Sequence, residues 1–413
     1  MTLDSARSNL WFVSLIAAGA LLATGCNAAD AVVRVAPDAR PETSVPGAEL
    51  DAGKPAVQAE LGTELVRIDK ATVERFPATI EAFAAGGVPT DDRGLLGRNR
   101  EWGALYSPRF QLGGLALRVF SATGDVARAA KAFRAIEVTT DTIQGDGTLP
   151  SSVPNLPEFG GQQPSAADAA SAAAFFLGDA CLALQGLLAT ARADEVASRE
   201  RRERATKGLA RAVTWLETKR SLLSSADKNA PNRLFHDALA FEACGALTGS
   251  SARGRAVEFV DAAMAQFNAN DGTYVEGGGF DTSYQAVNVT IAVDLLLAGH
   301  ILRRPALETQ LASATRWCAG RTTNDGRVDS SGNKRTCGGC ETFLPGDPPK
   351  QLSILSWFRA LVWTGTLFAD SDALAGAGRF EKWLSTKPAA SCFSRDTAGV
   401  LQPFSAASCR DGG

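Results

Sequence analysis

Two kinds of helical segment alternate along this chain from about residue 65 onward, and this alternation restricts the possible folds more than any other feature. Segments of one kind carry almost no charge, whereas segments of the other kind are amphipathic and charged. A helix that is apolar nearly all round is buried on every side, while an amphipathic helix covers a core with one face. The sequence therefore predicts an all-α fold with an inner and an outer layer of helices.

The two kinds of segment follow one another in pairs. The nearly charge-free segments are 102–121, 166–190, 232–247, 281–300 and 351–368. The charged segments are 125–136, 194–223, 252–267, 305–319 and 371–384. This order predicts five helical hairpins, with a sixth begun by 71–85.

Connections from a charge-free to a charged segment are short, whereas several returning connections are long and rich in turn residues. Three of the returning connections contain an Asp-Gly pair, at Asp146-Gly147, Asp271-Gly272 and Asp325-Gly326. Such pairs are typical of tight turns, because Gly and Asp tolerate a positive φ. Long loops gathered on one rim usually form a binding face.

The clearest junction runs from Asn270 to His300, where a Gly-rich loop leads into a helix with almost no charge. Asp281 is a good N-cap residue, because its carboxylate can accept N–H groups of the first turn. Asp281, Tyr284, Gln285 and Asn288 are three or four residues apart and so share one face of this helix. A polar face at the start of a buried helix predicts a binding or catalytic site there.

An outer helix, an Asp-Gly turn and then EGGGFDTSYQ at the start of an inner helix resemble the α/α-toroid proteins, and most of all the polysaccharide lyases and related glycan-active enzymes. The specific motif is Glu276–Gln285 together with Asn232-Arg233, and the similar arrangement covers roughly 70–385. The resemblance implies an (α/α) toroid or incomplete barrel over 61–390 that acts on or binds a polysaccharide without a cofactor. Terpenoid-cyclase-like toroids share the layout, but no acidic DxDD cluster occurs here.

Lyases of this kind cleave uronate polymers by β-elimination, which requires a group that neutralises the carboxylate, a base and an acid. In the family these roles fall to Asn or Arg, His and Tyr. The resemblance thus implies that His236 and Tyr284 are catalytic and that Asn232 and Arg233 bind substrate. The further substrate-binding residues that we expect are Glu276, Asp281, Gln285, Asn288 and Arg359.

Each of these residues also has a structural interpretation. His236 can be a packed side chain without a catalytic role, and Tyr284 can bury its ring. Asp281 can serve as an N-cap alone. Arg233 can pair with Asp237 one turn on. Arg359 needs a partner if it is buried, either a ligand or Asp294.

Two other functional classes stay open. A glycoside hydrolase needs two carboxylates, for which Glu276 and Asp281 are candidates with Asp168 or Asp179 from a neighbouring helix. A non-catalytic protein of the cell envelope would bind glycan or have a structural role. The tryptophans that could then stack on sugars are Trp102, Trp357 and Trp363.

The N-terminus predicts export. Arg7 precedes an apolar run over 10–23, and residues 22–26 (LATGC) resemble a bacterial lipobox in which Cys26 is lipidated. Residues 27–60 lack helical periodicity and suit a flexible tether with a span on the order of 30 Å. We therefore expect a membrane-anchored lipoprotein, periplasmic or at the cell surface, that contacts the membrane through its N-terminal lipid.

An exported location permits disulfides. The disulfide candidates are Cys318, Cys337, Cys340, Cys392 and Cys409, the last two of which could staple a C-terminal tail over 391–413. Cys181 and Cys244 lie in apolar helices, so we expect them to be packed thiols or to form one more disulfide. The CGGC sequence lacks two further zinc ligands nearby, so no metal is expected. The formal charge of −3 and the lack of a basic stripe argue against a nucleic-acid partner.

Overall fold

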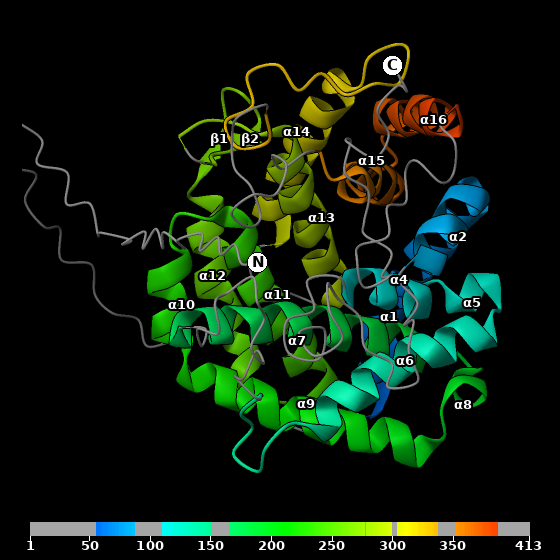
Figure 1. Cartoon of the computed structure of the whole chain (residues 1–413), viewed down its shortest axis with the longest axis vertical. Helices are drawn as coiled ribbons and strands as arrows, with labels where there is room; N and C mark the ends of the chain where they lie inside the picture. The colour runs from blue at the N-terminus through cyan, green and yellow to red at the C-terminus, as the bar shows by residue number, and fades with distance from the viewer. Residues whose placement is uncertain are drawn as a thin grey trace, which may run out of the picture. The chain divides into compact units, whose positions relative to one another are not determined.

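The computed structural model describes residues 55–86, 110–149, 165–276, 278–299, 304–337 and 352–386. These residues are mostly helical (Figure 1). The strands within them are β1 (Phe267–Asn268) and β2 (Thr273–Tyr274), which pair antiparallel on either side of an Asp-Gly turn. The all-α prediction is therefore confirmed.

Five described helices correspond to the nearly charge-free segments. They are α4 (Phe110–Arg118), α7 (Ala166–Leu188), α11 (Pro231–Thr248), α13 (Thr282–Ala298) and α15 (Ile354–Phe368). Each of the five packs against the next one along the chain. Almost every residue of α11 and α13 is buried, as expected for helices that are apolar nearly all round.

One of these helices, α7, contains a stretch (169–188) that is long and apolar enough to cross a membrane. In the folded protein 89% of that stretch is buried against the rest of the chain. A core helix has the same length and composition, and α7 packs here mainly against α11 and α4.

The charged segments form the helices that cover this inner set. They are α6 (Val126–Asp141), α9 (Arg199–Thr218), α12 (Ala256–Met264), α14 (Arg304–Arg321) and α16 (Ser371–Ser385). Each one packs on the inner helix that precedes it in the chain. Shorter helices complete the connections: α5 (Phe120–Thr123), α8 (Ala193–Val196), α10 (Arg220–Asp227) and the 3₁₀-helix η2 (Ser251–Arg255).

The predicted helix over 194–223 is divided into α8, α9 and α10. Ser198 has an extended backbone, and its side chain accepts a hydrogen bond from the N–H of Arg201, so α9 has a cap and a start of its own. Lys219 then separates α9 from α10.

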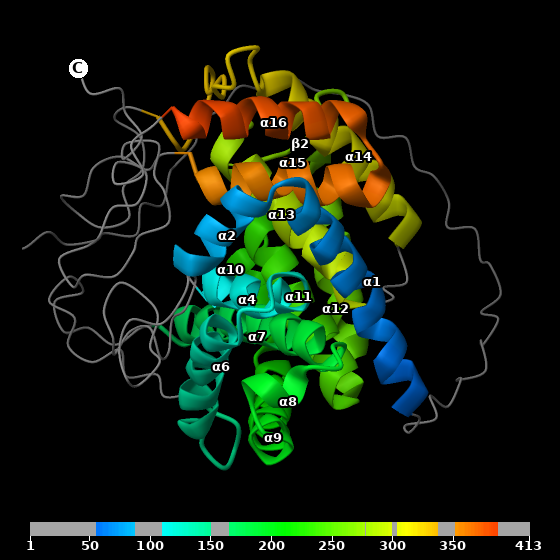
Figure 2. The ribbon, with the colours of Figure 1, turned by 90° about the vertical axis from the view of Figure 1, so that its right-hand side faces the viewer.

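The N-terminal part of the described chain consists of α1 (Pro55–Arg75) and α2 (Pro77–Gly86). Pro77 divides the two helices, because proline has no N–H to continue the hydrogen-bond ladder of α1. The rings of Phe76 and Phe83 lie 5.4 and 5.6 Å from that of Phe358 in α15, while α2 also packs on α4. Thus α2 lies between the last and the first hairpin (Figure 2). Because α1 begins at Pro55, residues 55–60 of the predicted tether over 27–60 are helical, and the rest of that segment lies outside the described residues.

The three Asp-Gly turns have a common structural role. Gly147, Gly272 and Gly326 have φ of 90°, 72° and 85°. A Cβ at Gly147 would lie 2.2 Å from the carbonyl oxygen of Arg211 in α9, and one at Gly326 would lie 2.1 Å from that of Arg379 in α16. Each turn therefore rests against the next outer helix and needs a residue without a side chain.

Candidate functional site

Asp281 fixes the start of α13. Its carboxylate accepts hydrogen bonds from the N–H groups of Ser283 (3.0 Å) and Tyr284 (3.2 Å) and, on its other oxygen, from those of Arg335 (2.9 Å) and Thr336 (2.7 Å). The hydroxyl of Thr336 also donates to it. Asp281 is fully buried. The N-cap interpretation is confirmed, and with these donors on both oxygens the carboxylate is not placed to act as an acid or a base.

Gln285 joins the β-hairpin to α13. Its Oε1 accepts from the N–H of Tyr274 (2.9 Å), and its Nε2 donates to the carbonyl of Gly272 (3.1 Å). The side chain is fully buried. Gln285 thus holds the turn in place, and its position does not support the predicted contact with substrate.

Glu276 is the centre of a second group of contacts at the same end of α13. Its Oε2 pairs with Nη1 of Arg335 at 2.7 Å, and its Oε1 accepts from Nδ2 of Asn288 at 3.4 Å. The main-chain N–H of Asn232, in the first turn of α11, lies near enough to this carboxylate to lower its pKa slightly. The guanidinium of Arg335 lies 3.8 Å from the ring centroid of Tyr284. We call Asn232, Glu276, Tyr284, Asn288 and Arg335 the rim cluster.

Burial dominates the electrostatics of Glu276, which is 1% exposed. Desolvation raises the pKa of its carboxyl, and Arg335 and Asn288 only partly oppose that rise. The sequence predicted four members of the rim cluster and missed Arg335. This arginine lies 59 residues beyond Glu276 in a turn-rich loop, and no spacing or periodicity relates the two.

Two amide oxygens of the rim cluster have no hydrogen-bond donor among the described residues. These are Oδ1 of Asn232 and Oδ1 of Asn288, and both atoms are buried. Buried acceptors in native proteins nearly always have a donor. Asn232 and Tyr284 are themselves only half-buried, and 22% of the Arg335 side chain is exposed, so the outer members of the cluster can meet a ligand.

Arg233 faces a different set of groups. Its guanidinium lies 3.1 Å from Asp227, the last residue of α10, and its charge also lowers the pKa of the predicted partner Asp237. Asp227 and Asp237 are both buried, and each carboxyl lies close enough to the other to shift its pKa. Burial raises the pKa of both carboxyls, and the nearby charge of Asp227 raises that of Asp237 further. Both effects favour the protonated form of Asp237.

His236 lies one turn deeper in α11 than Asn232. It is 1% exposed, and its ring centroid lies 3.9 Å from that of Phe175 in α7. Burial lowers the pKa of the imidazole to about 3. The packed interpretation describes this residue, because a neutral imidazole enclosed by helices cannot reach a polymer at the rim. Tyr284, by contrast, is half-buried and lies under Arg335 in the rim cluster.

Arg359 belongs to a buried charge network in the core. Its Nη2 lies 2.7 Å from Asp294, whose other oxygen lies 2.6 Å from Nη1 of Arg118. Arg118 makes two further hydrogen bonds to Asp69, of 3.0 and 2.8 Å. The four residues come from α15, α13, α4 and α1, and each side chain is at most 4% exposed. Asp294 is thus the partner of Arg359, which does not contribute to the rim.

The described residues give little support to a carboxylate pair of a glycoside hydrolase or to tryptophans that stack on sugars. Asp179 is buried in α7, and burial together with the charge of Asp294 raises the pKa of its carboxyl well above the usual value. Trp357 and Trp363 are 0% and 1% exposed, so both belong to the core. Trp102 and the side chain of Asp168 lie outside the described residues.

The cysteines agree with the expected pattern only in part. Cys181 and Cys244 form a disulfide between α7 and α11, with a Cα–Cα distance of 5.0 Å. Cys318 is a free, buried thiol inside α14, so its proposed pairing is wrong: its side chain faces the core rather than a loop. Cys337 is disulfide-bonded. The other cysteines singled out above lie outside the described residues: Cys26, Cys340, Cys392 and Cys409.

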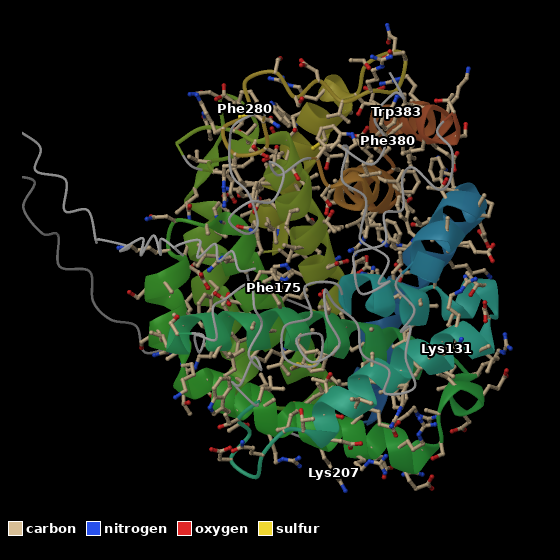
Figure 3. The ribbon with its side chains drawn as sticks, viewed as in Figure 1. Lys131, Phe175, Lys207, Phe280, Phe380 and Trp383 are labelled. Carbon is tan, nitrogen blue, oxygen red and sulfur yellow. A yellow bond between two sulfur atoms is a disulfide. The ribbon has the colours of Figure 1, made fainter. Side chains whose placement is uncertain are left out.

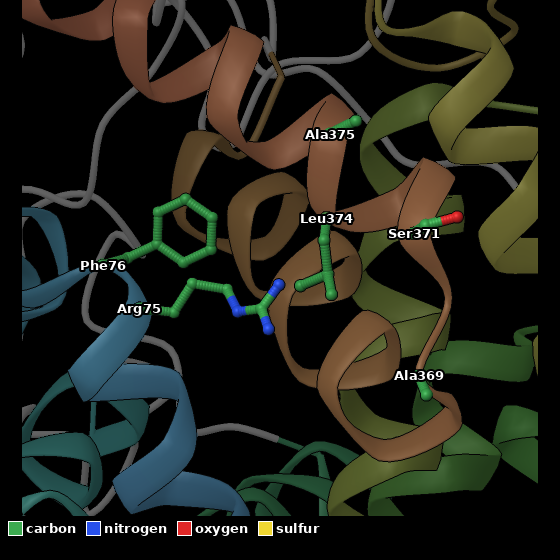
Figure 4. A pocket seen from close by; sticks show the side chains of 6 residues that line it. All are labelled: Arg75, Phe76, Ala369, Ser371, Leu374 and Ala375. Atoms are coloured by element: carbon green, nitrogen blue, oxygen red, sulfur yellow. The ribbon is translucent and has the colours of Figure 1, made fainter.

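Within the described residues no group of three or more His, Cys, Asp or Glu is arranged to hold a metal ion. An open hollow of about 510 Å³ lies between the α1–α2 junction and α15–α16 (Figure 4). Its lining residues are Arg75, Phe76, Ala369, Ser371, Leu374 and Ala375. Arg75 is the one titratable side chain in that lining, so the hollow offers no acid–base pair.

The fold and the rim cluster define a helical protein with a polar site at the N-terminal ends of two buried helices. No family model, curated protein or solved structure gives a significant match to this chain.

Proposed function

We propose that this is an exported α/α-toroid protein, lipid-anchored through Cys26, that binds a polysaccharide at the rim cluster. The order of helix contacts supports a toroid, because each inner helix packs on the next and α2 lies between α15 and α4. The export signal and lipobox of the N-terminus support the location.

One observation carries the binding proposal: two buried amide oxygens without a donor lie in the same cluster as a carboxylate and a partly exposed guanidinium. Sugar hydroxyls donate hydrogen bonds to amide and carboxylate oxygens, and Arg335 suits a carboxylate on the sugar. The cluster therefore fits a glycan that contains uronate better than an apolar ligand.

Binding is favoured over β-elimination because His236 is buried and its pKa is lowered to about 3. A general base has to lie within hydrogen-bond reach of the proton that it removes. Tyr284 alone, stacked under Arg335, supplies no base.

The test is calorimetric titration of the full chain with uronate-containing and neutral oligosaccharides. Asn232→Ala and Arg335→Gln each remove one contact to the ligand, and we expect a loss of affinity of roughly 10-fold or more from each. Arg327→Gln is the matched control, because Arg327 is 60% exposed in a neighbouring loop and pairs with Asp325. We expect it to bind as the wild type does.

Equal affinity of the Asn232→Ala and Arg335→Gln variants with the wild type would contradict a site at the rim cluster. Release of an unsaturated sugar by the wild-type protein would show that the chain is a lyase with a base other than His236, and the non-catalytic proposal would be wrong.

A further inference from the structure

The outer helices α6 and α9 pack side by side and carry an excess of positive charge (Figure 2). Together they contain nine Arg or Lys and five Asp or Glu, whereas the whole chain has a formal charge of −3. The two helices thus have a net charge of +4 (nine minus five) in a chain whose formal charge is negative.

A buried carboxylate organises the centre of this face. Glu137 of α6 is 2% exposed and lies 2.7 Å from Arg134 and 2.8 Å from both Arg201 and Arg204 of α9. The hydrogen bond from Arg201 contributes most to lowering the pKa of Glu137, to about 2. One negative charge beneath the surface thus holds three guanidiniums, whose side chains are 44%, 39% and 57% exposed.

Three further cations extend the face in both helices. Lys131 lies one turn before Arg134 on α6, while Lys207 and Arg211 lie one and two turns beyond Arg204 on α9. All three are exposed, and no ion pair to another described residue is formed by any of them. Figure 3 shows Lys131 and Lys207 on the outer side of these helices.

The acidic residues nearby leave this excess in place. Asp141 lies 3.5 Å from Arg204. Glu203 pairs with Arg199, and Asp194 pairs with Arg202, at the N-terminal end of α9. The six cations Lys131, Arg134, Arg201, Arg204, Lys207 and Arg211 therefore face solvent with Glu137 and Asp141 as their counter-charges.

We propose that this α6/α9 face binds an anionic lipid surface. Several Lys and Arg on one face attract acidic headgroups, each strengthening the association about fivefold near the surface. The predicted lipid at Cys26 would keep the folded part within reach of a bilayer. The face shares no residue with the rim cluster, so this proposal does not depend on glycan binding.

The test is co-sedimentation of the full chain carrying Cys26→Ser, which removes the predicted lipid, with vesicles. Phosphatidylcholine vesicles with about one-third phosphatidylglycerol present the acidic surface, and pure phosphatidylcholine vesicles measure binding by apolar segments. We expect tighter binding to the acidic vesicles. Raising the salt concentration toward 1 M should abolish the difference, because screening shortens the range of the attraction to about 3 Å.

The triple variant Lys131→Gln, Lys207→Gln, Arg211→Gln should bind the acidic vesicles roughly 100-fold more weakly, at about fivefold for each charge. The matched control Lys70→Gln, Arg327→Gln, Lys382→Gln removes the same charge from exposed positions elsewhere. We expect the control to keep wild-type binding, and circular dichroism should show that both variants fold.

Equal losses in the two triple variants would show that only net charge matters and would overturn the proposal. So would equal binding of the Cys26→Ser chain to acidic and neutral vesicles. A soluble acidic polysaccharide that binds with the same dependence on Lys131, Lys207 and Arg211, without any vesicle binding, would assign the face to a different partner.

Discussion

At the scale of single residues, Asp237 shows how burial changes a carboxyl group. No N–H or hydroxyl of the described residues donates to either of its oxygens, and its neighbour is a second buried carboxyl, that of Asp227. Arg233 and Ser171 oppose the rise in the pKa of Asp227 that burial causes. For Asp237, burial and the charge of Asp227 both favour the protonated form.

This pair predicts a dependence of stability on pH. The pKa of Asp237 is raised in the folded state, so its contribution is fully present below the unfolded-state pKa of about 3.9 and is lost as pH rises through the folded-state pKa. Asp237→Asn donates an N–H to Asp227 and does not ionise. We therefore expect a smaller fall of the urea unfolding midpoint between about pH 4 and pH 8 in this variant than in the wild type.

Asp372→Asn serves as the control for net charge, since Asp372 is exposed in the first turn of α16. Its pH profile should follow that of the wild type. If Asp237→Asn also keeps the wild-type slope, the ionisation of Asp237 does not cause the pH dependence.

At the scale of elements, α7 and α11 are joined both by packing and by a covalent bond. The Cys181–Cys244 disulfide links them across 63 residues of chain. Both helices are apolar enough to be buried side by side. The sequence therefore predicted either packed thiols or a disulfide for their two cysteines. Only the register of one helix against the other places the two sulfurs within bonding distance.

We expect the double variant Cys181→Ala, Cys244→Ala to lose about 2–4 kcal/mol of unfolding free energy, measured by urea denaturation. Its loss arises mainly because the unfolded chain regains the freedom of a long loop. Cys318→Ala is the control for removal of a buried sulfur without a bridge. A double variant that unfolds at the same urea concentration as the wild type would show that the bridge adds no stability.

At the scale of the whole molecule, the network of Asp69, Arg118, Asp294 and Arg359 joins helices from the beginning, middle and end of the described chain. Trp363 of α15 adds a hydrogen bond of 2.6 Å from its indole N–H to Asp69. Two carboxylates face two guanidiniums, so the buried charges are balanced. Such balance is necessary because a buried charge without a partner is costly.

Asp294→Asn would leave Arg118 and Arg359 without the charge that joins them. We expect a loss of about 3–5 kcal/mol of unfolding free energy, measured by urea denaturation. Glu195→Gln is the matched control, because the Glu195–Arg192 pair has side chains that are 46% exposed and should contribute little to stability. A small loss in Asp294→Asn, similar to that of the control, would show that the network is not needed for stability.

The sequence by itself determined the order and kind of the helices, the Asp-Gly turns and the cap at Asp281. These features depend on local periodicity and on φ preferences, which operate within a few residues. Only the tertiary structure decided which charges meet: Arg335 with Glu276, Arg233 with Asp227, and Arg118 with Asp294. It also decided that basic residues of α6 and α9, dispersed in the sequence, share one face. The physical reason is that a side-chain charge pairs with the opposite charge that the packing of the helices places beside it. Arg118 and Asp294, for example, are 176 residues apart in the sequence.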